Sequence, residues 1–437
     1  MLPTNGWRRA WQALVWMLYA SLLWLATPAY LLRLWRRGRT EPGYRGQLGE
    51  RLGFYAGQVP TSGVVWLHAV SLGETRAAVP LINALRVARP GMRLLLTHGT
   101  ATGRAAGAKL LAEGDWQAWL PYDTPGAVRR FLRQFQPDVG ILMETELWPT
   151  LMREAQRAGL PMVMANARLS ERSARRGERL AALLHPAAQR LSLVLAQTVD
   201  DARRLRDAGA PRVVVAGNLK FDMTPPAKLT ALGLQWRRSL KRPVVLAAST
   251  REGEEGGLLA AWAAQPAPRP LLLLVPRHPQ RFDEVAALVR QQGLALRRRS
   301  EWRVEPTPLA GQADVWLGDS MGEMAAYYAC ADVALLGGSF APLGGQNLIE
   351  AAACGCPVVM GPHTFNFEQA SKQSLAAGAA KRVADVDAGV RAAVALANDP
   401  QRNDWVDKAL GFANAHRGAA ALMAQQVLRL VDAPDGD

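Results

Sequence analysis

GGSFAPLGGQNLIEAAACGCPVVMGP, residues 337–362, is the stretch that decides the fold. The apolar run before it, Val333–Leu336, predicts a buried strand, and Pro357–Met360 predicts a second one. Between them lie a glycine-rich loop and a small-residue helix that begins near Asn347, where glycines and free N–H groups allow close approach of an anionic ligand. Glu350, in the first helical turn, is placed to bind the hydroxyls of a ribose. The simpler alternative is a buried unit whose glycines only make turns.

Composition and charge narrow the classes of protein to consider. The 437 residues suggest two to three domains at roughly 150 residues each, and a hydrophobic fraction of 49% is enough for packed cores. The formal net charge of +15 favours acidic partners such as nucleotides, nucleic acid or an anionic membrane surface. The cysteines, Cys330, Cys354 and Cys356, lack metal-binding spacing, so we expect no disulfide framework, no zinc site and a reducing compartment.

The N-terminal segment, residues 1–40, has the features of a membrane anchor. Ala10–Leu32 carries no charged side chain, and about 20 apolar residues are enough to cross a bilayer. The arginines of Arg33–Arg39 outnumber those before the segment, which predicts a cytoplasmic body. We expect either a spanning helix or a helix in the membrane plane, and a buried helix of a soluble protein is the alternative.

The remaining chain alternates between predicted strands and helices, which is typical of doubly wound α/β domains. In the first domain we predict strands at Val64–Ala69, Arg93–Thr97, Trp116–Leu120, Val139–Met143, Pro161–Ala165, Leu193–Ala196 and Val213–Ala216. In the second domain we predict strands at Val244–Ala248, Leu271–Val275, Leu294–Arg297, Val315–Leu317, Val333–Leu336 and Val358–Met360. Lys220–Lys241 is interpreted as the linker, Ser170–Leu184 as one arginine-rich helix and Trp405–Val431 as the last helix.

Polar motifs follow the predicted strands of the first domain, where ligands of open parallel sheets bind. In HAVSLGET, Glu74 stands at a strand-to-helix turn and is either a general base or a cap of the next helix. In METELWP, Glu144 and Glu146 would point the same way in an extended chain. Such a pair either orients hydroxyls or stabilises a cationic transition state, unless one of the two binds a neighbouring arginine. In GNLKFD, the ammonium of Lys220 suits a carboxylate or a phosphate.

The second domain carries a similar set of motifs after its strands. STREGEE and VPRHP each open a helix, and Arg277 and His278 suit a phosphate or a pyrimidine edge. In GDSMGE, Ser320 is a plausible N-cap with Glu323 three residues on, which is also a complete structural explanation for both residues. The short basic run Arg297–Arg299 is interpreted as a solvated face.

Two motifs of other nucleotide-binding enzymes are missing from the expected places in the sequence. No GxGxxG follows a predicted strand, which argues against a dinucleotide oxidoreductase, and no GxxxxGK[ST] loop is present. An Asp-rich metal loop is also missing, so we expect no metal.

Taken together and in this order, SLGE, ETELWP, NARLS, LKFD, PRHPQRF, MGE and GPHTFNFEQ resemble the 3-deoxy-D-manno-octulosonic acid (Kdo) transferase family of lipopolysaccharide synthesis. The resemblance covers nearly the whole chain. It implies the GT-B glycosyltransferase fold, with two Rossmann-like domains facing across a cleft and an N-terminal membrane-anchor helix. The implied domains are an anchor at 1–40, an acceptor-binding domain at 41–222 and a CMP-sugar-binding domain at 223–437.

The resemblance also implies a reaction and its partners. The donor is CMP-Kdo, the acceptor is a lipid A precursor, and transfer occurs with inversion on the cytoplasmic face of the inner membrane, without a cofactor, a metal or nucleic acid. Glu74 is the implied proton acceptor, and Glu144 and Lys220 stabilise the transition state. The implied CMP contacts are Arg277, His278, Met321, Gly322, Glu323, Asn347, Leu348, Ile349 and Glu350.

This sequence departs from the family pattern in the deciding stretch. It has GGQNLIE where the family usually has GGHNPLE, so Gln346 replaces a histidine and Leu348 a proline. Three alternatives remain at this point: another GT-B glycosyltransferase that uses a UDP-sugar, a UDP-sugar epimerase, and a membrane-tethered nucleotide-binding regulator without turnover.

Overall fold

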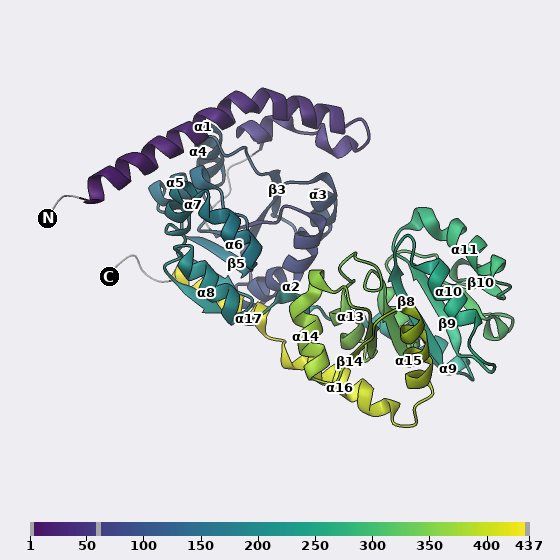
Figure 1. The fold of residues 1–437 in the computed structure, drawn as a ribbon. Coiled ribbons are helices and arrows are strands. Elements are labelled where there is room, and N and C mark those ends of the chain that lie inside the picture. Colours follow the sequence, from purple (N-terminus) through teal and green to yellow (C-terminus); the bar gives the residue numbers. More distant parts are fainter. Residues whose placement is uncertain (1–3, 58–62, 433–437) are drawn as a thin grey trace. The chain divides into compact units, whose positions relative to one another are not determined.

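The computed structural model describes residues 4–57 and 63–432. The chain divides into two compact units, one made of Met1–Met223 with Arg417–Asp437 and the other of Thr224–His416 (Figure 1). Within the described residues, each unit contains one seven-stranded sheet whose neighbouring strands are all parallel. Helices pack on both faces of each sheet, so both units are Rossmann-like domains, as predicted.

The first unit orders its strands β3-β2-β1-β4-β5-β6-β7. Their bounds are β1 Val64–His68, β2 Arg93–His98, β3 Trp116–Trp119, β4 Val139–Met143, β5 Met162–Ala167, β6 Leu193–Ala196 and β7 Val213–Val215. The helices between them are α2 Leu72–Ala88, α3 Ala101–Gly107, α4 Pro125–Phe135, α5 Pro149–Arg157, α6 Glu171–Glu178, α7 Ala181–Ala188 and α8 Val199–Asp207. The strand order reverses between β1 and β4, and ligands of such sheets bind beyond the carboxyl ends of strands at this point.

The second unit orders its strands β10-β11-β9-β8-β12-β13-β14. Their bounds are β8 Val244–Thr250, β9 Leu271–Pro276, β10 Leu296–Arg298, β11 Val315–Leu317, β12 Val333–Leu336, β13 Val358–Met360 and β14 Ala380–Arg382. The helices are α9 Ala227–Ser239, α10 Glu255–Ala263, α11 Phe282–Gln291, α12 Met324–Cys330, α13 Leu348–Ala353, α14 Glu368–Ala376, α15 Val386–Ala397 and α16 Arg402–Ala415. The predicted strand–loop–helix–strand unit is therefore β12, α13 and β13.

The segment predicted as a linker is part of the second unit. Lys220 lies in the short 3-10 turn η4, Leu219–Asp222, and α9 packs against α12. The indole of Trp236 on α9 is fully buried and donates a hydrogen bond to the carbonyl oxygen of Val304 at 2.7 Å. The prolines that suggested a linker precede α9 instead of interrupting it, and proline is tolerated at a helix start.

The predicted helix over Trp405–Val431 is two helices that belong to different units. The chain breaks at Gly418, whose φ of +104° is left-handed, and α17, Ala419–Asp432, packs on α2 in the first unit. Asp222 fixes its start, because its two carboxylate oxygens accept from the backbone N–H groups of Gly418 and Ala420, each at 2.6 Å. The predicted boundary of 223–437 for the second domain is thus wrong for this last helix. Ser170–Leu184 is likewise two helices, α6 and α7.

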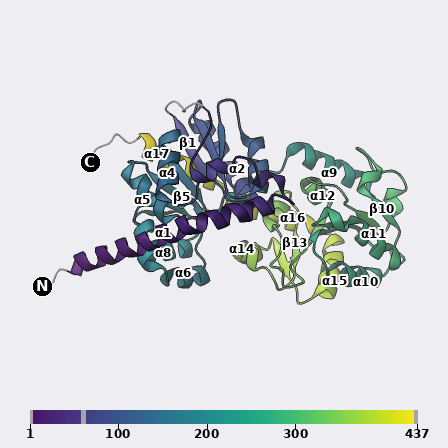
Figure 2. The same cartoon turned by 90° about the horizontal axis from the view of Figure 1, so that it is seen from above.

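The N-terminal helix α1, Thr4–Arg37, lies along the first unit (Figure 2). Side chains spaced three and four residues apart turn one stripe toward α5 and α7, and Tyr19 donates a hydrogen bond to Asp123 at 2.9 Å. The opposite stripe exposes large apolar side chains: Trp11, Leu14, Leu18, Leu22, Trp24 and Leu25. Among the described residues, one helix, over Ala10–Arg37, is long and apolar enough to cross a membrane, which fits membrane association.

Candidate active site

Three carboxylates gather at the carboxyl edge of the first sheet, where β1 and β4 lie side by side. Burial raises the pKa of Glu74, and the charge of Glu144 raises it further. Burial also raises the pKa of Glu146 from its ordinary value of 4.5 to about 7, with the charge of Glu74 as the next cause. Like charges shift one another's pKa in this way only when they are close, so the loops after β1 and β4 form one acidic site.

The carboxylate of Glu74 is held in place by the start of α2. Its Oε2 accepts from the backbone N–H of Val70 at 2.8 Å, and its Oε1 accepts from the hydroxyl of Ser71 at 2.9 Å. In return, Ser71 Oγ accepts from the backbone N–H of Glu74 at 3.3 Å, which makes a reciprocal capping box. These bonds lower the pKa of Glu74 but do not outweigh its burial. The sequence offered a helix cap and a general base as alternatives for Glu74. The structure shows that its side chain caps α2 and still has the raised pKa of a candidate base.

From the sequence we considered Glu144 and Glu146 in an extended chain, but the structure places them in a turn. Glu144 has a left-handed backbone with φ of +59°, and the N–H of Glu146 bonds back to the carbonyl oxygen of Met143 at 3.4 Å. This tight turn, and not strand alternation, brings both carboxylates beside Glu74. A left-handed backbone is strained for a glutamate, and such strain is concentrated at functional sites.

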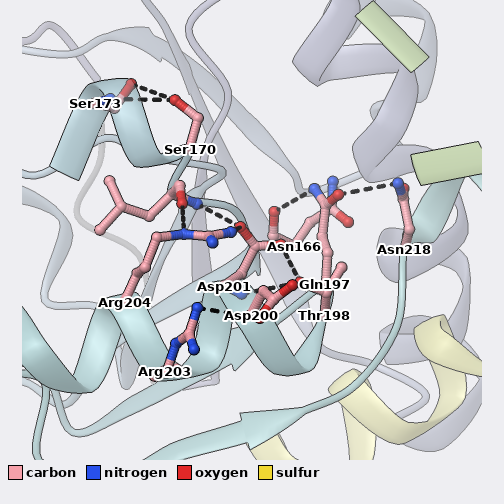
Figure 3. A network of polar contacts seen from close by, with 11 residues as sticks. Asn166, Ser170, Ser173, Gln197, Thr198, Asp200, Asp201, Arg203, Arg204 and Asn218 are labelled. Atoms are coloured by element: carbon pink, nitrogen blue, oxygen red, sulfur yellow. Dashed lines mark hydrogen bonds and ion pairs between the residues drawn. The ribbon is translucent and has the colours of Figure 1, made fainter. Parts of the chain in front are cut away.

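Asn166, Gln197 and Asn218 form a chain of amide side chains (Figure 3), which leads to the backbone of Lys220. Asn166 lies at the β-bulge of β5 with a left-handed φ of +52°, and its Oδ1 accepts from the backbone N–H of Leu219 at 3.1 Å. Gln197 donates to the Asn166 carbonyl oxygen at 2.8 Å and accepts from Asn218 at 3.0 Å. Asn218 in turn accepts from the backbone N–H of Lys220 at 3.0 Å.

This network holds the backbone of Lys220 so that its side chain lies near Glu144 of the acidic site. Burial lowers the pKa of its ammonium, Glu144 opposes that change, and Arg168 adds to it. A buried ammonium beside a carboxylate is ready to bind a second anion. The sequence drew attention to the motif that contains Asn166, but no pattern could show that its amide supports Lys220. The METELWP motif pairs Glu146 with Glu144, but the set of site residues implied by the family resemblance did not include Glu146.

Two buried histidines lie under the same loops. Burial lowers the pKa of His68 to about 3 and that of His98 to about 4, so both rings are neutral at physiological pH. His98 Nδ1 lies 3.0 Å from the carbonyl oxygen of Ala69 and therefore carries the proton there. These rings support the backbone before Glu74, and their pKa values do not suit general-base catalysis near pH 7.

In the second unit, the glycine-rich loop after β12 is held by its own contacts. A methyl group on Gly337 would overlap the carbonyl oxygens of Ser249 and Ala248. Gly338 has a left-handed φ of +70°, and its N–H donates to both carboxylate oxygens of the buried Glu254, at 2.7 and 2.9 Å. Glycine at these positions is therefore required for the turn and for close packing against β8, as the simpler alternative predicted.

The helix start after this loop matches the prediction. Asn347 is the N-cap of α13, and its Oδ1 accepts from the backbone N–H of Ile349 at 3.2 Å. Leu348 and Ile349 are only 1% and 2% exposed as whole residues, so both the side chains and the backbone of this first turn are buried. With six residues, α13 is also too short for a strong helix dipole.

Arg277 and Glu350 come together around one buried tyrosine. The charge of Glu350 raises the pKa of Tyr328, which burial already holds well above its usual range, and the charge of Arg277 opposes that rise. Glu350 also raises the pKa of Cys354, which reaches about 12 mainly because the thiol is buried. Two residues predicted to bind CMP, 73 positions apart in the sequence, thus lie near each other at the carboxyl edge of the second sheet.

The capping box predicted at Ser320 and Glu323 is wrong in its geometry. The helix α12 begins at Met324 with Glu323 as its N-cap residue, after a left-handed Gly322 with φ of +84°. The Ser320 hydroxyl donates to Glu323, whose other oxygen accepts from Arg299 at 3.0 Å. Arg299 is buried, so the run predicted as a solvated face contributes an internal ion pair.

Met321 and His278, which we also predicted to contact CMP, are exposed. Met321 precedes the left-handed turn before α12, and His278 follows Arg277 after β9. Both lie on loops at the carboxyl ends of strands, as the motif analysis predicted.

Known structures with the same arrangement of two parallel sheets are glycosyltransferases and sugar-nucleotide epimerases. A glycosyltransferase from Rickettsia africae covers 86% of this chain and 99% of its own, with 12% identity and a TM-score of 0.56. UDP-GlcNAc 2-epimerase from Neisseria meningitidis covers 84% of this chain and 100% of its own, with 15% identity and a TM-score of 0.56. At these identities the likeness shows the fold alone, which is the GT-B fold.

Sequence relatives define the family within that fold. Residues 46–223 match the family model described as 3-deoxy-D-manno-octulosonic-acid transferase (kdotransferase). The 3-deoxy-D-manno-octulosonic acid transferase of Bordetella pertussis is 47% identical over 90% of this chain and 94% of its own length. That of Haemophilus influenzae is 35% identical over 90% and 92%. The chain belongs to the 3-deoxy-D-manno-octulosonic acid transferase family.

Proposed function

We propose that this protein transfers Kdo from CMP-Kdo to a lipid A precursor, lipid IVA, with inversion at the anomeric carbon. Family membership supports the reaction class, since the Bordetella pertussis and Haemophilus influenzae relatives are named as Kdo transferases. The observation that carries the mechanism is the acidic site at the β1–β4 edge beside Lys220, where the charge of Glu144 raises the pKa of Glu74 and the charges of Glu74 and Glu144 raise the pKa of Glu146.

Glu74 is the general base. A raised pKa makes its carboxylate a better proton acceptor, and its bonds to Val70 and Ser71 fix its orientation. Glu74 takes the proton from an acceptor hydroxyl while that oxygen forms the new bond to the anomeric carbon. The bond between that carbon and the CMP phosphate oxygen breaks, and its electron pair leaves with CMP. The base and the nucleophile stay on the face opposite the leaving group, so the configuration inverts.

Glu144 and Lys220 stabilise the transition state. Positive charge develops on the sugar as CMP leaves, and a nearby carboxylate favours that charge. Lys220, partly desolvated and facing Glu144, pairs with the carboxylate of the donor sugar or with its phosphate. The left-handed turn at Glu144 is the structural cost of placing this carboxylate against the other two.

The second unit holds CMP. Glu350 accepts hydrogen bonds from the ribose hydroxyls, and Arg277, which lies near it, binds the phosphate. His278 and the segment Met321–Glu323 contact the rest of the nucleotide. Asn347, Leu348 and Ile349 form the floor of the CMP site at the start of α13, where Leu348 and Ile349 are almost fully buried.

The first unit binds the acceptor. A cavity of about 840 Å³ begins beside Thr145 and Leu147, next to the acidic site, and continues between α6, α7 and α8. Leu184 and Leu205 contribute to its apolar wall, which suits an acyl chain. Arginines on or just after α6 line an adjacent hollow of about 300 Å³ and suit the phosphates of a lipid A precursor: Arg172, Arg175, Arg176 and Arg179. The exposed apolar stripe of α1 supports membrane association, and in this proposal the protein binds the inner membrane from its cytoplasmic side.

The reaction itself is tested with purified full-length protein in detergent, CMP-Kdo and lipid IVA. Mass spectrometry of the lipid should show the mass of at least one Kdo added, with one CMP released per sugar. UDP-N-acetylglucosamine in place of CMP-Kdo should give neither transfer nor epimerisation. Nucleotide binding without any lipid product would instead favour a tethered regulator, and turnover of the UDP-sugar would favour an epimerase or another transferase.

A further inference from the structure

A second cavity of the first unit, unrelated to the acidic site, lies between α1, α5 and α7. Its volume is about 500 Å³. The lining residues are Gln12, Ala13 and Trp16 of α1, Pro149, Arg153, Gln156 and Arg157 of α5, and Ala182, Leu183, Pro186, Gln189 and Arg190 on or just after α7. Three of these residues are arginines and none is an aspartate or glutamate.

The three arginines are poorly neutralised. Arg157 pairs with Glu154 at 2.8 Å, but Glu154 also contacts Arg129 at 3.6 Å. In the part of the chain that the structure describes, no carboxylate oxygen lies within 4.0 Å of the Arg153 or Arg190 side-chain nitrogens. Arg190 donates to the neutral amide of Gln156 at 2.9 Å.

Burial and mutual repulsion both act on this cluster. The pKa values of Arg153 and Arg190 are lowered first by burial and then by their arginine neighbours, with Glu154 opposing the change at Arg153. The Arg153 guanidinium lies 3.8 Å from the centroid of the Trp16 ring, which fixes it flat against α1. Gathering cations in this way is unfavourable unless an anion joins them.

The position of the cavity indicates where that anion comes from. Trp16 forms one wall, and the same helix exposes its apolar stripe, including Trp11 and Leu14, within one or two turns of the cavity. Leu183 adds an apolar wall inside, and Leu180 is 56% exposed just before α7. A cationic floor with apolar surroundings beside a membrane-binding helix matches the boundary between lipid phosphates and acyl chains.

We propose that this cavity binds the phosphate of an anionic phospholipid from the leaflet that α1 contacts. Arg153 and Arg190 donate to the phosphate oxygens, Arg157 adds charge, and the lipid chains follow the exposed stripe of α1. The lipid thereby fastens α1 to α5 and α7. The inference rests on the membrane association in the proposed function and is independent of sugar transfer.

The test uses the full chain in dodecyl maltoside micelles that contain phosphatidylglycerol at increasing mole fraction. Thermal unfolding midpoints should rise and saturate. In Gln156→Glu, a carboxylate of the same shape replaces the amide that holds Arg190 and supplies an internal counterion. We expect its apparent affinity for phosphatidylglycerol to fall at least about tenfold, which corresponds to about 1.4 kcal/mol.

The matched control is Gln291→Glu, the same change at an exposed position of the second unit, which should leave the affinity unchanged. Arg153→Gln with Arg190→Gln should abolish saturation. If inorganic phosphate at equal concentration reproduces the rise, the site takes a soluble anion and the lipid proposal is overturned. An unsaturable rise, or equal rises in Gln156→Glu and Gln291→Glu, overturns it as well. CMP release with lipid IVA is measured separately in micelles without phosphatidylglycerol, so failure of the sugar transfer is not mistaken for failure of this site.

Discussion

The carboxylate of Glu146 should destabilise the folded protein at alkaline pH, and Glu146→Gln should relieve that effect. The pKa of Glu146 is about 7 in the folded state against an ordinary value of 4.5, because of burial and the charge of Glu74. A carboxyl whose pKa is raised on folding costs nothing below pH 4.5, costs progressively more between the two values and reaches its full cost above pH 7. The difference corresponds to about 3 kcal/mol at pH 8 and less than about 1 kcal/mol at pH 5.

The assay is the thermal unfolding midpoint of the first unit, followed by tryptophan fluorescence at pH 5 and at pH 8. For a unit of this size, 1 kcal/mol moves the midpoint by about 2–4 °C, so Glu146→Gln should gain roughly 6–12 °C at pH 8 and little at pH 5. Glu113→Gln, at an exposed position after α3, is the control and should gain nothing at either pH. A gain of the same size at both pH values, or a loss at pH 8, would refute the reasoning that the acidic site is strained by its own charge.

Three more predictions concern the residues around that site. Because the pKa of Glu74 is raised, kcat/KM should fall as the pH drops through this pKa and the Glu74 carboxylate becomes protonated. Glu146→Gln removes a like charge and should move this acid limb of the pH profile to lower pH. An acid limb that does not move contradicts the coupling between the two carboxylates. Asn166→Ala should cost about 2–4 kcal/mol of stability and lower kcat, because it leaves the Leu219 N–H unpaired and strains a left-handed backbone. Asn166→Gly should recover about 1 kcal/mol of that loss, measured by urea unfolding, since glycine adopts this backbone without strain. Equal losses in the two variants would disprove the backbone contribution. Asp222→Ala should remove the cap of α17 at a cost of about 1 kcal/mol, which should appear as faster hydrogen exchange of the α17 amides. Unchanged exchange would show that packing on α2 is enough to hold the start of α17.

The sequence predicted the strands well because most of them are apolar along their whole length. Val139–Met143, Leu193–Ala196 and Val333–Leu336 are buried at every residue, and such runs are limited on both sides by polar loops. The missed strand, β14, lies at the sheet edge and exposes Lys381 and Arg382, so it leaves no apolar run to detect. The helix α9 was mistaken for a linker because its prolines mark a helix start as readily as a loop.

The site was predictable as a set of loops but not as a geometry. Glu74, Glu144 and Lys220 follow strands, so parallel-sheet topology alone predicts that they gather at one edge. The turn at Glu144 and the bulge at Asn166 depend on left-handed backbones at residues other than glycine, which local sequence does not specify. The METELWP motif already pairs Glu146 with Glu144, but the pKa of Glu146 depends on burial created by the whole fold, so its coupling to Glu74 became visible only in the structure.

The central claim is that Glu74 accepts the proton of the acceptor hydroxyl, and one comparison tests it most directly. CMP release from CMP-Kdo in the presence of lipid IVA is measured for the unchanged protein and for Glu74→Gln, with binding of CMP checked in both. General-base catalysis contributes about 10²–10⁴-fold, so turnover in Glu74→Gln should fall by that factor while CMP binding stays the same. Turnover within a few-fold of the unchanged protein would contradict the account.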